Sequence, residues 1–320
     1  MTKKKDTNQT EPKQAAEILT PDGGRGLDAI MARIGMMRQQ SPVREPGEPA
    51  DRGPLPPRPM PAPTQAPTPP KPQELEQCTL PGVPAAPQGK APMGNQLART
   101  PLFAPIKRGR RQVIDKGKLP SPDGIALWYF GRQLDTGDQD VYLTALMLAK
   151  GIEPDTPIII NRAEFLKLTG RKADGRTYQW LMQSFERIST GRLFYDTPEE
   201  RGSTPLVGPL RYKKESGDYY FTIPKESLRA FGFNQFGYVD MEQRRLIELG
   251  LAKWLQCYAV SHAKGEHRVC VENLQNWSGF TGRSRQFKGN LQEALADLVR
   301  VGVIQSWELY ERETKVKWIR

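Results

Sequence analysis

The stretch that decides the fold runs from Pro157 to Thr190 and reads PIIINRAEFLKLTGRKADGRTYQWLMQSFERIST. A short β-branched run comes first, and a compact apolar segment follows it and ends at Gly170. After the loop RKADG, apolar residues recur at helical spacing as far as Thr190. The stretch therefore predicts a short strand, a helix closed by glycine, a turn and a longer helix over Arg176–Thr190.

The flanking sequence completes one structural module. Upstream, Asp135 to Lys150 opens with acidic and threonine residues suited to a helix cap and continues as an apolar helix. Downstream, GRLFYDT and LVGPLRYKKESGDYYFTIP are predicted as strands, with a turn at Ser216-Gly217-Asp218. This order of elements (helix, strand, helix, turn, helix, hairpin) is that of a winged helix-turn-helix domain. In such domains the second helix of the helix-turn-helix motif enters the DNA major groove.

The longer helix separates two kinds of side chain on a wheel of about 100° per residue. Arginine and glutamine are suited to bidentate contacts with guanine and adenine edges, so we interpret this helix as a recognition helix. An ordinary solvated helix face is the alternative, although such faces usually hold more Glu and Lys. The apolar face comprises Tyr178, Leu181, Met182, Phe185 and Ile188, and the polar face Arg176, Gln179, Gln183 and Arg187.

The same order of elements recurs towards the C-terminus. Asp240 to Gly265 is predicted as one apolar helix containing Leu246, Leu249, Leu251, Trp254, Leu255 and Tyr258. HRVCV is then predicted as a short strand, ENLQNWSGF as a compact helix and VIQSWELYERETKVKWIR as a terminal hairpin. The chain is therefore expected to have an α+β fold with tandem winged-helix domains.

The second recognition helix is expected within SGFTGRSRQFKGNLQEAL, from Ser278 to Leu295. Basic residues at a helix N-terminus oppose the helix dipole, and bound phosphates would compensate for them. The wings would add further phosphate contacts. The expected core face is Phe287, Leu291, Ala294, Leu295 and Leu298; the DNA face is Arg283, Arg285, Lys288, Gly289 and Gln292; the wing residues are Lys213, Lys214, Lys315, Lys317 and Arg320.

The N-terminal part has another composition. Most of the 29 prolines fall between positions 41 and 90, which predicts disorder with extended segments over residues 1–95. Within it, Gly26 to Gln40 has helical spacing and is either a weak helix or a short docking helix. Residues 96–134 are expected to form a basic arm and entry strands, residues 135–232 the first winged-helix domain and residues 233–320 the second. The arm residues Lys107, Arg108, Arg110 and Arg111 would hold phosphates, a solvated linker being the alternative.

The overall composition points to a polyanionic partner. The chain has 320 residues, a formal net charge of +11 and a sequence pI of about 9.5, which favours nucleic acid first and anionic membranes second. No apolar run is long enough to span a membrane, and the start lacks the apolar stretch of a signal peptide. Cys78, Cys257 and Cys270 are scattered, without a zinc or disulfide pattern. We therefore expect a soluble, cytoplasmic protein that binds double-stranded DNA.

No catalytic constellation is found. The only histidines, His262 and His267, match neither a nickase HxH pair nor HExxH and are expected to lie at the surface or in caps. Asp135, Asp138 and Asp140 could be read as a Mg²⁺ site, but their place at a helix start favours caps. The chain also lacks a phosphate-binding GxxxxGK[ST] loop. We expect no enzyme activity, no metal and no cofactor.

From about Ala98 to Arg320 the chain resembles the TrfA family of plasmid replication initiators. The matching text includes ARTPLF, LTGRKADGRTYQWLMQSFERISTGRLFYDT, MEQRRLIELGLAKWLQCYAVSHAKGEHRVCVENLQNWSGF and LQEALADLVRVGVIQSWEL. The resemblance implies binding to repeated origin sequences (iterons) by monomers, opening of an adjacent AT-rich region, and inactive dimers in a monomer–dimer equilibrium. It also implies recruitment of the host initiator, helicase and sliding clamp.

Two points qualify this resemblance. A well-known member of the family carries a clamp-binding pentapeptide, whereas QLARTPLF, from Gln96 to Phe103, has only the ends of that motif with extra residues between them. Winged helices also serve in transcriptional regulators, because a fold does not determine a function. A sequence-specific regulator without a replication role is therefore the alternative.

Overall fold

The computed structural model describes residues 83, 86–106, 111–122, 126–196, 200–230 and 235–320. All of these residues belong to one compact unit, Pro72–Arg320. Several predictions fall outside the described residues: the helix over Gly26–Gln40, Cys78, and the arm residues Lys107, Arg108 and Arg110.

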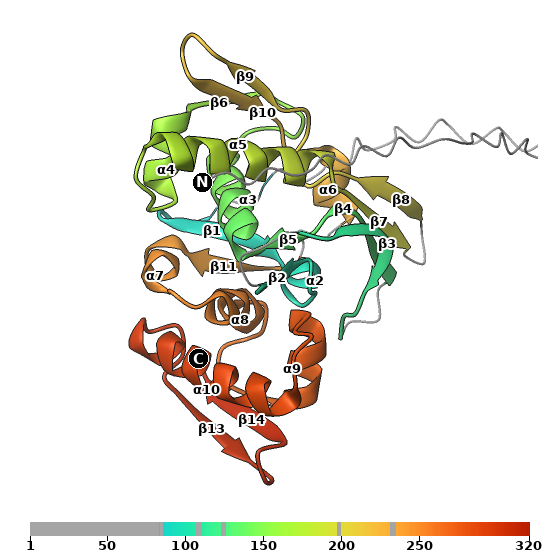
Figure 1. Cartoon of the computed structure of the whole chain (residues 1–320), viewed down its shortest axis with the longest axis vertical. Helices are drawn as coiled ribbons and strands as arrows, with labels where there is room; N and C mark the ends of the chain where they lie inside the picture. Colours follow the sequence, from blue (N-terminus) through green and yellow to red (C-terminus); the bar gives the residue numbers. More distant parts are fainter. Residues whose placement is uncertain (1–82, 84–85, 107–110, 123–125, 197–199, 231–234) are drawn as a thin grey trace, which may run out of the picture. The chain divides into compact units, whose positions relative to one another are not determined.

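The first module has the predicted winged-helix order (Figure 1). It consists of α3 (Thr136–Leu148), β6 (Ile158–Asn161), α4 (Arg162–Leu168), α5 (Gly175–Thr190), β9 (Arg211–Lys213) and β10 (Asp218–Phe221). Asp135 caps α3, because its Oδ1 accepts a hydrogen bond from the backbone N–H of Asp138 at 2.9 Å. Gly170 follows α4 at φ 74°, a left-handed conformation that glycine adopts without strain. The strands form an antiparallel sheet of order β6-β10-β9.

Phe185 lies at the centre of this module's core. Its ring centroid is 5.0 Å from that of Phe165, 5.1 Å from that of Tyr219 and 5.3 Å from that of Phe221. A buried side chain of this size stabilises the fold by roughly 1.5–3 kcal/mol. Leu181, Phe185 and Ile188 are buried, whereas Tyr178 and Met182 are half-buried, so the predicted apolar face of α5 is confirmed.

The strand after α5 does not join the wing. The sequence GRLFYDT does form a strand, β7 (Arg192–Asp196), but it pairs between β4 (Ala126–Arg132) and β8 (Arg201–Thr204). With β3 (Val113–Leu119) these strands form a sheet of order β3-β4-β7-β8. The pairing buries Leu127 and Tyr129 of β4 together with Leu193 and Tyr195 of β7. The expected place of GRLFYDT within the winged-helix module is therefore wrong. Its strand pairs with β4 because the buried side chains of the two strands pack together on one face of the sheet.

The second module repeats the order at the C-terminus. It consists of α8 (Gly250–Val260), β12 (Glu266–Cys270), α9 (Val271–Ser278), α10 (Ser284–Arg300), β13 (Ser306–Tyr310) and β14 (Lys315–Ile319). The sheet has the order β12-β14-β13. The predicted core face of α10 is confirmed, since Phe287, Leu291, Ala294, Leu295 and Leu298 are all buried.

The single helix expected over Asp240–Gly265 is wrong. The chain forms α7 (Met241–Leu246), breaks at Ile247, whose ψ of 122° is extended, and resumes as α8. Arg244 and Ile247 are buried, whereas Leu246 is 59% exposed. The apolar spacing that predicted one helix thus does not describe one buried face.

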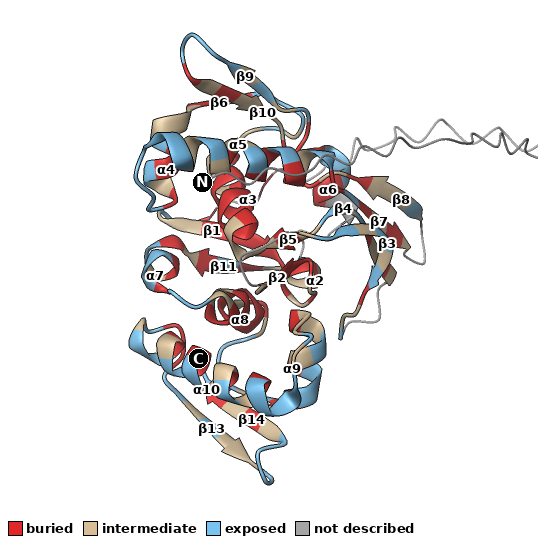
Figure 2. Ribbon diagram, viewed as in Figure 1, coloured by how far each residue is buried: buried red, intermediate tan, exposed pale blue. Residues whose placement is uncertain are grey.

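Two further strand pairs lie between the elements of the modules. β1 (Lys90–Gly94) pairs with β11 (Phe236–Asp240), and β2 (Phe103–Ala104) pairs with β5 (Leu134–Asp135). The short helices α2 (Asn95–Ala98) and α6 (Lys225–Ala230) complete the unit. In Figure 1, α8 lies between the β1–β11 pair and α10, and in Figure 2 most of α3 and α8 is buried. Because β1 is part of this structure, the expected boundary at residue 96 lies too far along the chain.

A buried carboxylate links the two modules. Oδ1 of Asp140 on α3 lies 2.6 Å from Nε of Arg244 on α7, and Oδ2 lies 2.7 Å from Nζ of Lys253 on α8. Burial alone would raise the pKa of Asp140, but the two cations outweigh burial and lower it. The expectation of a helix cap is met by Asp135 and by Asp138 in the capping box, whereas Asp140 instead joins α3 to the second module.

Candidate nucleic-acid interface

The outer face of α5 carries side chains suited to base contacts. Arg176, Gln179 and Gln183 are exposed, as the sequence predicts. Asp174 closes the helix N-terminus through a reciprocal capping box with Thr177, whose hydrogen bonds lower the pKa of the Asp174 carboxyl group. That carboxylate disfavours a phosphate at this helix end, so the exposed side chains are the binding groups that α5 offers.

Arg187 does not lie on this outer face. Its side chain is only 10% exposed, and its Nη2 lies 2.7 Å from Oδ1 of the fully buried Asp138. The expected exposed position of Arg187 is therefore wrong, because the start of α3 covers this part of α5 and supplies a counter-charge. Arg187 belongs to the core of the first module.

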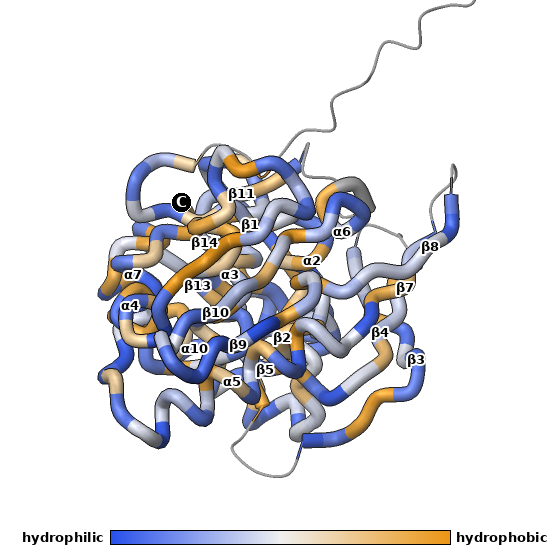
Figure 3. Tube along the Cα trace, turned by 90° about the horizontal axis from the view of Figure 1, so that it is seen from above, coloured by the Kyte–Doolittle hydropathy of each residue, from blue (hydrophilic) through white to orange (hydrophobic). Residues whose placement is uncertain are grey.

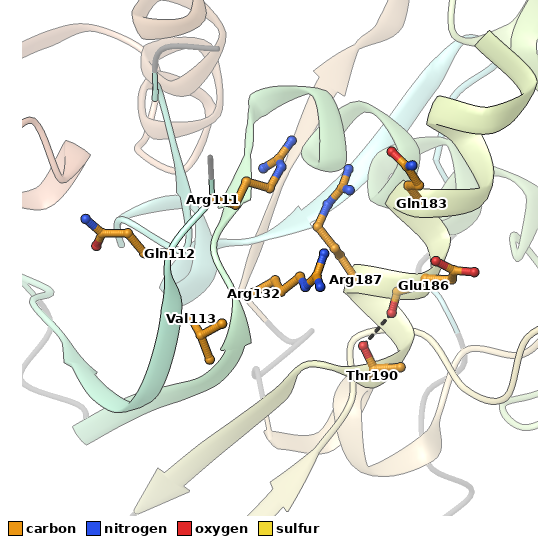
Figure 4. A pocket seen from close by; sticks show the side chains of 8 residues that line it. All are labelled: Arg111, Gln112, Val113, Arg132, Gln183, Glu186, Arg187 and Thr190. Atoms are coloured by element: carbon orange, nitrogen blue, oxygen red, sulfur yellow. Dashed lines mark hydrogen bonds between the residues drawn. The ribbon is translucent and has the colours of Figure 1, made fainter. Parts of the chain in front are cut away.

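A groove of about 1230 Å³ lies beside the C-terminal half of α5 (Figure 4). Figure 4 shows Arg132 extending from β4 towards α5, where Gln183, Glu186 and Arg187 lie. Arg111, the described member of the expected arm, also lines it, but its guanidinium lies 2.5 Å from Asp135 and 3.2 Å from Asp138. Arg111 thus has a structural ion-pairing role, whereas Arg132 is exposed beside the recognition helix.

The N-terminus of α10 differs from that of α5. Arg283 occupies the N-cap position, no side chain caps the helix, and the first turn has no acidic residue. Arg283 at the N-cap and Arg285 in the first turn are both exposed. Backbone N–H groups, the helix dipole and arginines together favour an anion. Lys288 and Gln292 are half-buried on the same outer side.

The two wings differ in charge. Lys213 and Lys214 of the first wing are exposed, as expected. In the second wing each expected lysine is paired: Nζ of Lys315 lies 2.7 Å from Glu311, and Nζ of Lys317 lies 2.8 Å from Glu308. The second wing is therefore close to electroneutral.

Two further contacts alter the expected basic surface of the second module. Arg320 turns onto α8, where its Nη1 donates to the carbonyl of Ala259 at 2.8 Å, so it does not extend the wing. Lys288 of α10 lies 3.6 Å from Glu313 at the tip of the second wing. An acidic side chain thus faces the second recognition helix.

Sequence reasoning missed three arginines near α5. Arg171 stacks on Trp180 at 3.9 Å and Arg162 on Tyr178 at 4.0 Å, which places both guanidinium groups at the start of the recognition helix. The basic pair in the turn RKADG was a usable signal for Arg171. No local signal marks Arg132, because its position depends on the pairing of β4 with β3 and β7.

The histidines are not at the surface, contrary to the expectation. His262 and His267 are half-buried and stacked, with ring centroids 4.1 Å apart. Burial, with His267 and two arginines nearby, lowers the pKa of His262 to about 3. Among the described residues, no cluster of three or more His, Cys, Asp or Glu side chains is placed to hold a metal ion. In the same part of the chain, no helix is both long and apolar enough to cross a membrane.

No protein-family model and no curated protein matches the chain. Among solved structures, it is similar to domains 2 and 3 of RctB at 13% identity and a TM-score of 0.47, covering 67% of this chain and 93% of that one. It is similar to the Pi initiator protein, solved in complex with iteron DNA, at 12% identity and a TM-score of 0.44, covering 57% and 92%. The WH1 domain of the replication protein MSBI1.176 is 14% identical with a TM-score of 0.24, covering 31% and 80%.

Proposed function

We propose that the protein is a plasmid replication initiator that binds repeated sequences of origin DNA through its two winged-helix modules. The observation that carries the proposal is the presence of two recognition helices with exposed arginine and glutamine side chains in one compact unit. Arg176, Gln179 and Gln183 of α5 and Arg285 of α10 read bases, while Arg283 and the N-terminus of α10 hold a phosphate.

The link between the modules supports reading by a single chain. Asp140, Arg244 and Lys253 connect α3 to α7 and α8 through buried contacts. Two different modules held in this way suit an asymmetric, directly repeated site, whereas a symmetric dimer suits a palindrome. A site read by both helices spans about two helical turns, on the order of 20 base pairs.

The replication role rests on the resemblance to the TrfA family. In this proposal the protein acts in the cytoplasm by binding and not by catalysis. It opens an adjacent AT-rich region and recruits the host initiator, helicase and sliding clamp, and a dimer is the inactive form.

Selection of bound duplexes from a random pool tests the DNA-binding part. We expect an asymmetric sequence, bound by one chain. Arg285→Ala should weaken binding of the selected duplex by roughly 1–3 kcal/mol and should weaken binding of a scrambled duplex far less. Lys150→Ala, which removes an exposed charge just after α3, is the control and should leave the ratio of the two affinities unchanged. A selected palindrome bound by two chains would contradict this reading.

Plasmid maintenance tests the replication part. A plasmid that carries the selected repeats beside an AT-rich segment should be maintained only when the protein is supplied, and Arg285→Ala should abolish maintenance. Specific binding without maintenance would favour a transcriptional regulator.

A further inference from the structure

The outward face of the four-stranded sheet carries aromatic and basic side chains that the duplex-binding helices do not use. Leu127, Tyr129, Leu193 and Tyr195 fill the core face, so the alternate residues of β4 and β7 lie on the opposite face. We call this surface the aromatic–basic face. It comprises Lys116, Lys118, Trp128, Phe130, Arg192, Phe194 and Asp196.

The strand register sets the aromatic rings side by side. Trp128 lies directly opposite Phe194, and Phe130 lies opposite Arg192. Directly opposed residues share one face of a sheet with their Cβ atoms about 4.5–5.5 Å apart, so Trp128 and Phe194 are cross-strand neighbours, and Phe130 lies on the same face two residues along β4. In Figure 3 hydrophobic segments lie along β4 and β7, β3 has both hydrophobic and hydrophilic segments, and β8 is hydrophilic at its outer end.

Cations surround these rings. Lys118 of β3 lies opposite Trp128, and the ammonium group of Lys116 lies 4.9 Å from the ring centroid of Phe194. Arg192 is exposed on the same face. Alternation also places Asp196 of β7 there, where it is paired with the exposed Arg201 of β8. Cations thus outnumber the one acidic side chain, so the face is complementary to a polyanion.

The exposure of the aromatic surface is unusual for a solvated sheet face, where polar residues normally lie. Phe130 is 45% exposed, and Trp128 and Phe194 are half-buried. A ligand that covers these rings must therefore have flat apolar groups as well as negative charge. Unpaired nucleotides have both, whereas the base faces of a duplex are hidden in its stack.

We propose that the aromatic–basic face binds single-stranded DNA. Bases stack on Trp128, Phe130 and Phe194, and the phosphates lie against the flanking lysines and Arg192. Arg132, at the end of β4, lies in the groove beside α5 and follows Gly131, whose φ of 141° interrupts the regular strand conformation, so the groove begins where this face ends. The site goes beyond the duplex-binding function and does not depend on it.

Fluorescence anisotropy with the full chain and a labelled oligo(dT) of about 20 nucleotides tests the site, since single-strand sites commonly cover about 4–16 nucleotides. Phe130→Ala should weaken oligo(dT) binding roughly 5- to 100-fold, as expected for loss of one stacking ring. Binding of the selected duplex should stay within about twofold, because the two sites do not share Phe130. Ile159→Ala is the control, because Ile159 is 59% exposed on β6, in the separate β6-β10-β9 sheet of the first module, and it should change neither affinity.

A second pair of variants separates stacking from charge. Trp128→Phe should keep the affinity for oligo(dT) but remove much of the tryptophan quenching that binding causes. Arg192→Gln should reduce the salt slope of oligo(dT) binding by about 0.7, and the slope for the duplex should not change. Unchanged thermal melting of each variant shows that the fold is intact.

Three results would overturn the proposal. The first is no binding of oligo(dT) by the wild-type chain at low salt. The second is an equal reduction of the affinities for oligo(dT) and for the duplex in Phe130→Ala. The third is tighter binding of oligo(rU) than of oligo(dT), which would assign the face to RNA. Failure of the duplex-binding proposal is distinguishable, because it would appear as absent sequence preference in the duplex assay while oligo(dT) binding persists.

Discussion

Asp138 and Arg187 form a buried ion pair that joins the start of α3 to the C-terminal half of α5, with Nη2 and Oδ1 2.7 Å apart. Oγ of Ser184 donates to the same carboxylate oxygen at 2.6 Å, and Arg111 reaches Oδ2 at 3.2 Å. One carboxylate thus caps α3 and fixes the recognition helix against it. The orientation of the α5 face that is proposed to contact bases therefore depends on a buried ion pair outside that face.

Arg187→Ala should lower the free energy of unfolding by about 3 kcal/mol, because it removes the nearest cation from a buried carboxylate. Urea unfolding measures this change. Gln183→Ala, on the exposed face of the same helix, is the control and should change stability by less than about 0.5 kcal/mol. Unchanged stability with loss of sequence-specific binding would instead make Arg187 a base contact.

Asp140→Asn should weaken the link between the modules. Arg244 and Lys253 would then be buried without their counter-charge, at a cost of about 3–5 kcal/mol. Because the two modules have separate hydrophobic cores, calorimetry should show the unfolding transition broaden or divide. Asp196→Asn removes the exposed partner of Arg201 and should cost at most about 1 kcal/mol. Equal effects of both substitutions would contradict the role given to Asp140.

Glu313→Gln should strengthen DNA binding. The substitution removes the acidic neighbour of Lys288, 3.6 Å away, and frees a cation beside the second recognition helix. The gain should be equal for specific and scrambled duplexes, and the salt slope should steepen by about 0.9. Gel shifts at several salt concentrations measure both, with Glu153→Gln, an exposed loop residue of the first module, as the control. An unchanged slope would show that Lys288 does not approach a phosphate.

Local periodicity was enough to predict α3, α4, α5, α9 and α10 and the buried faces of α5 and α10, because each face is defined within a few helical turns. It missed the break at Ile247 that divides the expected helix over Asp240–Gly265 into α7 and α8. It could not predict that β7 pairs with β4 or that β1 pairs with β11, since these partners are far apart in sequence. Arg187 shows the same limit. It lies on the polar side of the helix wheel, but in the fold it is buried against Asp138, which lies almost 50 positions earlier in the sequence. The aromatic–basic face likewise exists only through strand register.

His262 should make the stability of the protein depend on pH in the acid range. Burial first, then His267 and the nearby Arg99 and Arg320, hold the folded-state pKa of His262 at about 3, whereas an unfolded histidine titrates near about 6.5. The unfolded chain then binds a proton more readily than the folded chain, so this stability is complete above about pH 6.5 and falls progressively as the pH drops towards 3. Although burial raises the pKa of Asp140, Arg244 and Lys253 hold it below its usual range, so the stability that Asp140 contributes begins to fall only at a lower pH than the stability from His262 does.

Thermal melting between about pH 7.5 and about pH 5 should therefore show a falling Tm in the wild-type chain and a weaker fall in His262→Gln. Because the chain has only two histidines, their NMR signals can be assigned from this one variant. The ring signal of His262 should not titrate above about pH 5, since its folded form stays neutral there. A midpoint near the ordinary histidine value, or the same pH dependence of Tm in both proteins, would show that the stacked pair is hydrated and does not contribute.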